Sequence, residues 1–500
     1  MPKQTSKKIL LILIVALIVW FFRPFFHPII MSFVISPLKA IAVLAIIAGI
    51  YMFFKSLGPL KIEKVNPSSY TIKPAKRVSG SLVTGYVVII IVLFISLFLE
   101  SEIRYTITSK KIDYTAKSNL PTFEPARLTP KQVAARYADD SFQNPQEHLG
   151  DSQIILVDGK LKRVFPRLPD GGLLYFINKL SGFVTVDVDT LDRKVSIEDQ
   201  KFEYSEGVGI FDNLYYRLHL KKYFVTYTNE PIYLKDDAGK WVTVVPYMSY
   251  RGFPFTTPYW AGVMVAKSDG SIEDYTPEQA QQISYLKGNR IHPKEIVNFY
   301  THSYSYKNGL LNKWFIHKNQ IEIVNLPSDE QVIHVPTNEG FKQLVVAEPY
   351  GRSYGIYKIF LIDATTGDRE IIEYDQNSQL TGPVAAADYI KREFPTYNWN
   401  SFSLSEPRPM KIGQDLYWML SIIPNDAAGI AQTVLFNTKT NKVIGFKTEE
   451  EFKTIMQSGV LPEQTSVQTP EPTKTKDQEI KNKIDSIEKE VQDLKKLIGE

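Results

Sequence analysis

The chain has no cysteine among its 500 residues. This absence excludes disulfide scaffolds, thiolate zinc sites, iron–sulfur clusters and cysteine nucleophiles. Positive and negative charges are nearly balanced: 58 Lys+Arg stand against 54 Asp+Glu, which gives a net charge of +4. Proteins that bind nucleic acid usually carry a strongly basic patch or pI. We therefore expect no nucleic acid among the partners.

Signatures of catalysis are missing as well. The chain contains no Gly-x-Ser-x-Gly elbow, no Gly-rich phosphate loop and no His-Glu-x-x-His pair. Four of the seven histidines fall in one span, at positions 292, 302, 317 and 334, without the spacing of a helical ligand pair. Tyr300, His302, Tyr304 and Tyr306 alternate, which predicts a strand with all four on one face. We predict no catalytic residue, no metal site and no cofactor, although an acid pair for glycoside hydrolysis stays open.

Long apolar runs are confined to the first hundred residues, at 9–22, 38–54 and 82–99. A spanning helix needs about 17 to 25 apolar residues, so the second and third runs fit and the first is short. A cleaved signal peptide is the rival interpretation of the first run, but no small-residue cleavage site follows it. Residues 23–37 are expected to form an outer loop or a re-entrant piece at the interface.

Basic residues predict the orientation of these helices. The loop 55–81 carries six Lys or Arg and one acid, and the tail before residue 9 carries Lys3, Lys7 and Lys8. Both should be cytoplasmic under the positive-inside rule. Three crossings then leave the residues after about 100 outside the cytoplasm of a bacterium, as a multi-pass protein of the cell membrane with the lipid bilayer as a partner.

The remaining chain is predicted to be α+β. Aromatic residues make up 12% of the sequence, which favours strands. Residues 101–128 form a stalk, and a helix then opens with Thr129 as its N-cap and one apolar face. That face consists of Val133, Ala134, Tyr137 and Ala138. Alternating runs at 154–157, 173–177, 183–188 and 194–197 predict an antiparallel sheet.

One pattern, a strand, an Asp- or Asn-initiated turn and a strand, recurs four times. The copies occupy residues 184–195, 263–273, 360–371 and 434–444. The Asp or Asn side chain begins the reversal, and a Gly or Asn takes the left-handed position. These loops lack the alternating acids of an EF-hand, so we interpret them as hairpin turns and not as calcium sites.

The helix followed by such a hairpin resembles the PepSY and PepSY-like domains of exported and membrane-anchored bacterial proteins. The resemblance covers 129–141 with 184–197 and 383–394 with 434–446, and 359–374 without a clear helix. In two copies the family's Asp-x-x-Thr-Gly turn is altered, by Asp192-Arg193 and by Asn437 with Asn441. The resemblance implies noncatalytic modules, sometimes associated with peptidase restraint or surface protein contacts.

An aromatic-dense stretch lies between these copies. Six of its residues cluster in a Pro/Gly-rich segment and are candidates for a shelf that stacks on a peptide or a cell-wall glycan: Tyr247, Tyr250, Arg251, Phe253, Tyr259 and Trp260. Strand cores also use such residues heavily, so core packing is the competing interpretation.

The carboxyl-terminal end is expected to be a disordered linker, 461–475, followed by a coiled coil, 476–500. Its seam repeats with heptad spacing: Ile480, Ile484, Ile487, Val491, Leu494 and Ile498. We predict self-association, or pairing with another coiled-coil protein; docking of this helix on its own domain is the alternative.

These features predict seven segments: anchor 1–100, stalk 101–128, PepSY-like unit 129–200, aromatic-rich β unit 201–345, PepSY-like unit 346–460, linker and coiled coil. The function expected is a noncatalytic, membrane-anchored, extracytoplasmic protein that presents surfaces for protein or cell-envelope contacts within an oligomer. An envelope enzyme or peptidase regulator, and a component of a transport or secretion complex, are the alternatives.

Overall fold

The computed structural model describes residues 2–57, 60–66, 69–74, 80–157, 159–326, 332–351, 355–375 and 380–458. The chain divides into two compact units, Met1–Lys447 and Thr448–Glu500. In the second unit the structure shows one helix, α10 (Glu449–Ser458). The predicted linker and coiled coil, including all six seam residues from Ile480 to Ile498, lie outside the described residues and stay predictions.

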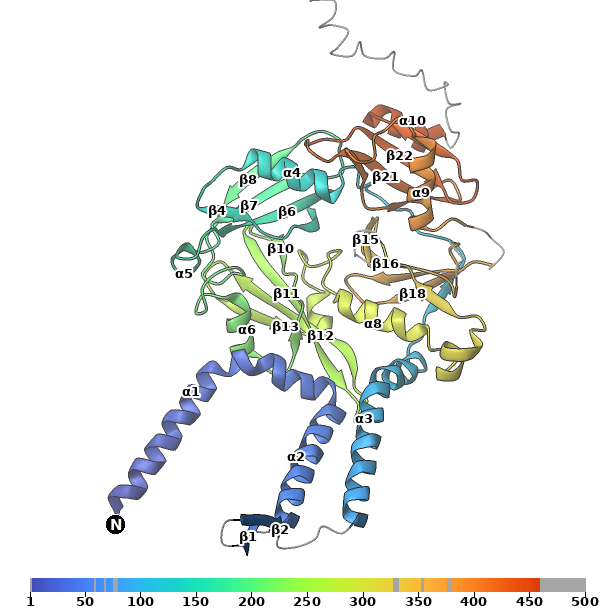
Figure 1. The fold of residues 1–500 in the computed structure, drawn as a ribbon. Coiled ribbons are helices and arrows are strands. Elements are labelled where there is room, and N and C mark those ends of the chain that lie inside the picture. The colour runs from blue at the N-terminus through green and yellow to red at the C-terminus, as the bar shows by residue number, and fades with distance from the viewer. Residues whose placement is uncertain are drawn as a thin grey trace, which may run out of the picture. The chain divides into compact units, whose positions relative to one another are not determined.

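The first unit opens with long apolar helices (Figure 1). The elements are α1 (Pro2–Ile35), α2 (Pro37–Leu57), the hairpin β1 (Leu60–Asn66) with β2 (Ser69–Pro74), and α3 (Gly80–Ser109). Among the described residues, the stretch Leu13–Ile35 is long and apolar enough to cross a membrane, and Pro37–Tyr51 is a shorter apolar helix. A membrane anchor and a signal sequence both fit this first helix.

Residues 23–35 form the second half of α1, so the predicted outer loop is corrected to helix. This half lies along α6 (Leu214–Lys221), where Arg23 donates to the Leu220 carbonyl (2.6 Å). The His27 ring contacts the Val225 carbonyl through Nε2 at 2.9 Å. These polar contacts with the folded region explain why an arginine and a histidine interrupt the apolar pattern.

The predicted stalk is also corrected. Helix α3 continues past the expected end to Ser109. Strand β3 (Thr115–Lys117) pairs in parallel with β18 (Arg369–Glu373) and so adds an edge strand to the sheet of the third repeat described below. Leu120 and Phe123 are buried in a hydrophobic core. Residues 101–128 therefore belong to the folded region.

Four copies of one arrangement follow, each a helix and a five-stranded antiparallel sheet. The first repeat contains α4 (Lys131–Ser141), β4 (Glu147–Leu149), β5 (Gln153–Val157), β6 (Lys160–Pro169), β7 (Gly182–Asp187) and β8 (Val195–Asp199). The second contains α6, β9 (Thr226–Tyr227), β10 (Ile232–Lys235), β11 (Trp241–Arg251), β12 (Thr257–Lys267) and β13 (Ile272–Tyr275). The third contains α8 (Lys294–Tyr304), β14 (Ile321–Ile323), β15 (Ile333–Thr337), β16 (Gly340–Pro349), β17 (Lys358–Asp363) and β18 (Arg369–Glu373). The fourth contains α9 (Pro383–Glu393), β19 (Phe402–Leu404), β20 (Arg408–Ile412), β21 (Asp415–Pro424), β22 (Gln432–Asn437) and β23 (Val443–Phe446).

The strand pairing is the same in every repeat. The first two strands are short and both pair with one edge of the long third strand, and the fourth and fifth strands continue the sheet from its other edge. In the third repeat, for example, β14 pairs with the carboxyl end of β16, β15 with its amino end, and β17 with its opposite edge. Short elements lie in the connections: α5 (Leu174–Ile177) between β6 and β7, α7 (Pro277–Ala280) between β13 and α8, and the π-helical turn Asn312–Ile316 between α8 and β14.

The four predicted hairpin turns are confirmed, and each joins the last two strands of one repeat. In the third repeat the Asp363 carboxylate accepts the backbone N–H of Thr365 and of Thr366, both at 2.8 Å. Gly367 follows with φ of +79°, which a side chain would resist. The fourth repeat places Asn437 and Asn441 in the same two roles, with φ of +57° at Asn441.

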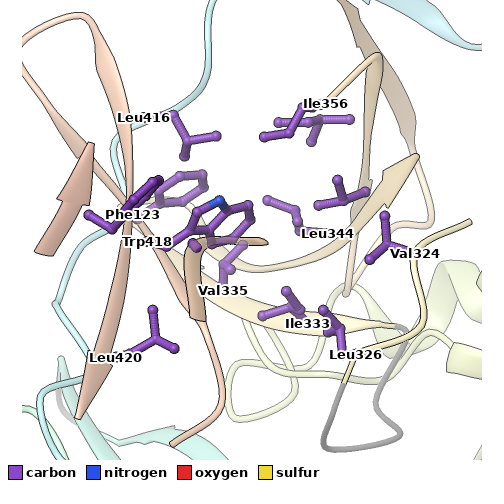
Figure 2. Packing of buried hydrophobic residues seen from close by; sticks show 14 of the residues in the cluster. Phe123, Val324, Leu326, Ile333, Val335, Leu344, Ile356, Leu416, Trp418 and Leu420 are labelled. Atoms are coloured by element: carbon purple, nitrogen blue, oxygen red, sulfur yellow. The ribbon is translucent and has the colours of Figure 1, made fainter. Parts of the chain in front are cut away.

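Successive side chains along a strand point to opposite faces of its sheet, so each sheet can pack a hydrophobic core on both faces. In β16, Leu344 faces the core shared with the fourth repeat, whereas its neighbour Val345 faces α8. Figure 2 shows the shared core, in which Trp418 of β21 lies close to Leu344 and Phe123. The first and second repeats likewise share a core through Phe183 and Trp241, whose ring centroids are 4.6 Å apart.

Several expectations are wrong in detail. The predicted boundary at 345 falls inside β16, because the region 201–345 holds the second repeat and half of the third. The predicted strand at 173–177 is largely the short helix α5, and the alternating tyrosines around His302 lie mostly on helix α8. Helix α4 is preceded by Pro130, and Thr129 instead donates its hydroxyl to the Thr190 carbonyl.

Candidate functional site

A polar cavity of about 200 Å³ lies where the four repeats meet. Each repeat contributes the beginning of its second strand: Gln153 on β5, Glu230 just before β10, His334 on β15 and Glu406 just before β20. Because the strand pairing repeats, these four strand starts occupy equivalent positions in their sheets. The cavity is therefore a product of the repeat architecture.

Cationic side chains dominate its lining. Five come from the first and third repeats and the segments that lead into them: Arg127, Lys131, Arg163, Arg290 and Lys294. Among the residues that the structure describes, the lining also contains three carboxylates, those of Asp151, Glu230 and Glu406. Arg127, Arg163 and Arg290 are all buried. Since burial in a low dielectric disfavours charge, a site with this excess of cations favours an anion.

Arg290 lines the cavity and contacts two neutral side chains there. One of its Nη atoms donates to the amide oxygen of Gln153, and the other lies 3.3 Å from Nδ1 of His334. Burial, then the charges of Arg290 and Lys294, lower the pKa of His334 well below its usual value. The ring therefore stays neutral at physiological pH and accepts from the guanidinium through Nδ1.

Arg163 is positioned in a similar way on β6. Its guanidinium donates to the Ser152 hydroxyl at 3.0 Å, beside the start of β5. Lys294, at the start of α8, donates to the Glu230 carboxylate. The guanidinium forks are thus fixed in orientation before any ligand enters, which is the arrangement that recognises oxyanions in a bidentate manner.

Two of the lining residues, Arg127 and Glu406, form an ion pair with each other. Arg127 and Glu406 approach to 3.2 Å, and the backbone N–H of Lys131 donates to the same carboxylate at 2.9 Å. Although burial opposes it, the charges of Arg127 and Arg408 hold the pKa of Glu406 below its usual value. Burial also lowers the pKa of Arg408 to about 9. Glu406 is accordingly ionised at neutral pH and is unsuited to donate a proton.

The predicted aromatic shelf is divided between a core and a hairpin tip. Tyr247 is buried, and its hydroxyl donates to Asp274 at 2.6 Å and accepts from Lys222. Trp260 is half-buried, donates its indole N–H to the Gly262 carbonyl at 3.0 Å and joins the core of the first two repeats.

The other four predicted residues lie toward the end of the β11–β12 hairpin. The Tyr250 hydroxyl donates to Thr226 at 3.2 Å, and the Arg251 guanidinium lies 5.5 Å from the ring centroid of Tyr259. Phe253, at the tip, is 77% exposed. The six residues thus do not form one continuous surface, and a role for them in stacking on a ligand stays a prediction.

Sequence reasoning missed the cavity because its residues range from Arg127 to Pro407. One local signal was present: a Pro-Lys pair opens both α4 and α8, at Pro130-Lys131 and Pro293-Lys294. Both lysines line the cavity. In the part of the chain that the structure describes, no group of three or more His, Asp or Glu side chains is arranged to hold a metal ion.

Comparisons with known proteins assign no family. No protein-family model matches the chain, and no curated protein matches it. One solved structure is that of a protein named as a candidate glycoside hydrolase from Parabacteroides distasonis; the match covers 66% of this chain and 79% of that one, at 10% identity and a TM-score of 0.18. A likeness of that size carries no conclusion about fold or activity.

Proposed function

We propose that this chain is a noncatalytic, membrane-anchored binding protein whose repeats together bind an anionic group in the cavity between them. The observation that carries the proposal is the lining, which in the described part of the chain has five cationic side chains against three carboxylates. A bound oxyanion would neutralise charge that the fold has already taken out of water.

The ligand expected is a small oxyanion or a molecule that presents one, such as a phosphate or a carboxylate. A volume of about 200 Å³ admits one such group and little more. The engagement of Glu230 by Lys294 and of Glu406 by Arg127 favours binding over catalysis, because both carboxylates are already committed to cations.

The test is thermal unfolding of the full chain in detergent with inorganic phosphate or acetate as probes. A ligand at about 100 times its Kd stabilises a protein by about 2.7 kcal/mol, so a rise of several degrees in Tm is expected with at least one probe. Arg290→Gln should abolish the rise, whereas Arg193→Gln, at an exposed turn, should keep it.

Should Arg290→Gln fail to fold, Lys294→Gln provides the same comparison, since this side chain is only partly buried. A Tm that neither probe raises in the unaltered chain, or that rises equally in the cavity variants, would contradict the proposal. The phosphate and acetate arms separate the two ligand chemistries.

We further propose that α1, α2 and α3 cross the bacterial membrane and leave the repeats outside the cytoplasm. Many apolar side chains of α2 and α3 are exposed, including Leu44 (66%) and Phe98 (66%). The carboxyl-terminal ends of α1 and α3 form hydrogen bonds to the repeats. The lysine-rich β1–β2 hairpin connects the carboxyl-terminal end of α2 to the amino-terminal end of α3. A helix of 21 residues is about 31 Å long, which matches a bilayer core.

Labelling of single cysteines checks this orientation, because the chain has no cysteine of its own. Thr440→Cys, in an exposed turn, should react with a membrane-impermeable maleimide on intact cells. Lys64→Cys, in the β1–β2 hairpin, should react only after lysis. Labelling of Lys64→Cys before lysis, with Thr440→Cys protected, would reverse the orientation.

The PepSY-like character is likewise proposed for all four repeats. What supports it is the order of elements: a helix, then a sheet that ends in a hairpin with an Asp- or Asn-initiated turn in the third and fourth repeats. Superposition of the first repeat alone on solved PepSY domains checks the proposal, and a different strand order in those domains would contradict it.

A further inference from the structure

Some of the large exposed apolar side chains of the repeats lie on segments that contact the apolar helices, whereas others, such as Leu173 and Phe176 at α5, lie elsewhere. The set consists of Phe211, Phe224, Phe253, Leu311, Trp314, Phe315 and Ile316, which we call the aromatic belt. Each member is at least 40% exposed. Such groups are costly to leave in water when they form a continuous surface.

The first part of the belt lies beside α1. Phe224 is 64% exposed, and both of its neighbours are tied to the helix. The Tyr223 hydroxyl donates to the Arg23 carbonyl at 2.8 Å, and the Val225 carbonyl contacts His27. Phe211, nearby, has its ring centroid 5.9 Å from that of Phe21 on α1.

The second part is the tip of the β11–β12 hairpin, which reaches the junction of the helices (Figure 1). The Thr256 hydroxyl donates to the Ile35 carbonyl at the end of α1, and the Thr256 backbone carbonyl accepts from Nε of Arg104 on α3 at 2.8 Å. These contacts place Phe253 at the helix ends, although its own ring is 77% exposed.

The third part is the π-helical turn after α8. Tyr306 stacks on Tyr105 of α3 with ring centroids 5.3 Å apart, and Lys313 lies over the Tyr306 ring. The turn that follows presents Trp314 and Phe315 to solvent, the latter 73% exposed. This turn therefore lies beside the carboxyl-terminal part of α3.

We propose that the aromatic belt inserts into the outer headgroup region of the bilayer that holds α1–α3, so that the repeats rest on the membrane. The argument is position: three segments far apart in sequence each contact α1 or α3 in the half of the helix that bonds to the repeats. Trp concentrates at this depth because its ring is amphipathic, and the apolar Phe, Leu and Ile side chains of interfacial segments bury at the boundary between headgroups and acyl chains. Arg251, Lys307 and Lys318 are exposed and lie within a few positions of belt residues in the sequence, which favours anionic phospholipids.

This inference rests on the proposed anchoring, and spin labelling separates the two. The full chain is reconstituted in nanodiscs of phosphatidylcholine and phosphatidylglycerol with one nitroxide at Phe253→Cys or Phe315→Cys. We expect collision with O₂, relative to a water-soluble nickel complex, to be several-fold higher at both sites than at Thr440→Cys. Leu44→Cys on α2 serves as the bilayer reference.

Lipid-like accessibility at Leu44→Cys with water-like values at Phe253→Cys and Phe315→Cys would overturn the belt and leave the anchoring intact. Water-like values at all sites would overturn the anchoring itself. If one belt substitution prevents folding, Phe224→Cys provides a third position with the same expectation.

Discussion

Replacing Trp418 by alanine should lower the free energy of unfolding by about 3 to 5 kcal/mol, the usual cost of truncating a buried Trp to Ala. The side chain is fully buried in the core that the third and fourth repeats share (Figure 2). Its indole N–H also donates to the Thr381 carbonyl at 3.1 Å, and that acceptor would lose its partner. Chemical denaturation of the full chain in detergent measures the loss.

Trp314→Ala is the matched control, since this tryptophan is 41% exposed in the aromatic belt. In detergent its replacement should change the free energy of unfolding by about 0.5 kcal/mol or less. Equal losses for the two variants would contradict the shared core.

Glu406→Gln should cost about 3 to 5 kcal/mol, because it leaves the Arg127 guanidinium buried without its counter-charge. The two side chains are 11% and 9% exposed and 3.2 Å apart. The charges of Arg127 and Arg408 outweigh burial and hold the pKa of Glu406 below its usual value in the folded chain. The stabilisation from the ionised Glu406 is therefore present above the unfolded-state pKa and is lost as pH falls through the folded-state pKa. Denaturation at neutral and acidic pH should show the variant approaching the unaltered chain under acid.

Glu203→Gln supplies the comparison at the surface, where Lys179 and Glu203 are 32% and 53% exposed. An exposed pair contributes about 1 kcal/mol or less. Adding Arg127→Met to Glu406→Gln should recover part of the loss, because the unpaired cation is then removed. A small effect of Glu406→Gln alone, or no recovery in the double variant, would show that the pair is not buried as described.

Local chemistry explains which predictions succeeded. The hairpin turns of the second, third and fourth repeats depend on an Asp or Asn side chain and a left-handed residue within a few positions, so the sequence encodes them directly. In the first repeat the Thr190 hydroxyl accepts the backbone N–H of Asp192 instead. The apolar face of α4 was predicted residue by residue from its helical spacing. Helix α8 was misread because Tyr300, Tyr304 and Tyr306 alternate as they would on a strand, and tertiary packing overrode that pattern.

From the sequence alone came the apolar character of the amino-terminal region, the mixed α and β composition and the repeated hairpins, because hydropathy and turn chemistry act over short stretches. Only the tertiary structure decided that the hairpins belong to four equivalent repeats and that a cationic cavity forms where they meet. Its walls combine residues from Arg127 to Pro407, and no local pattern specifies which strand starts will face one another. That choice is made by the burial of one sheet against the next.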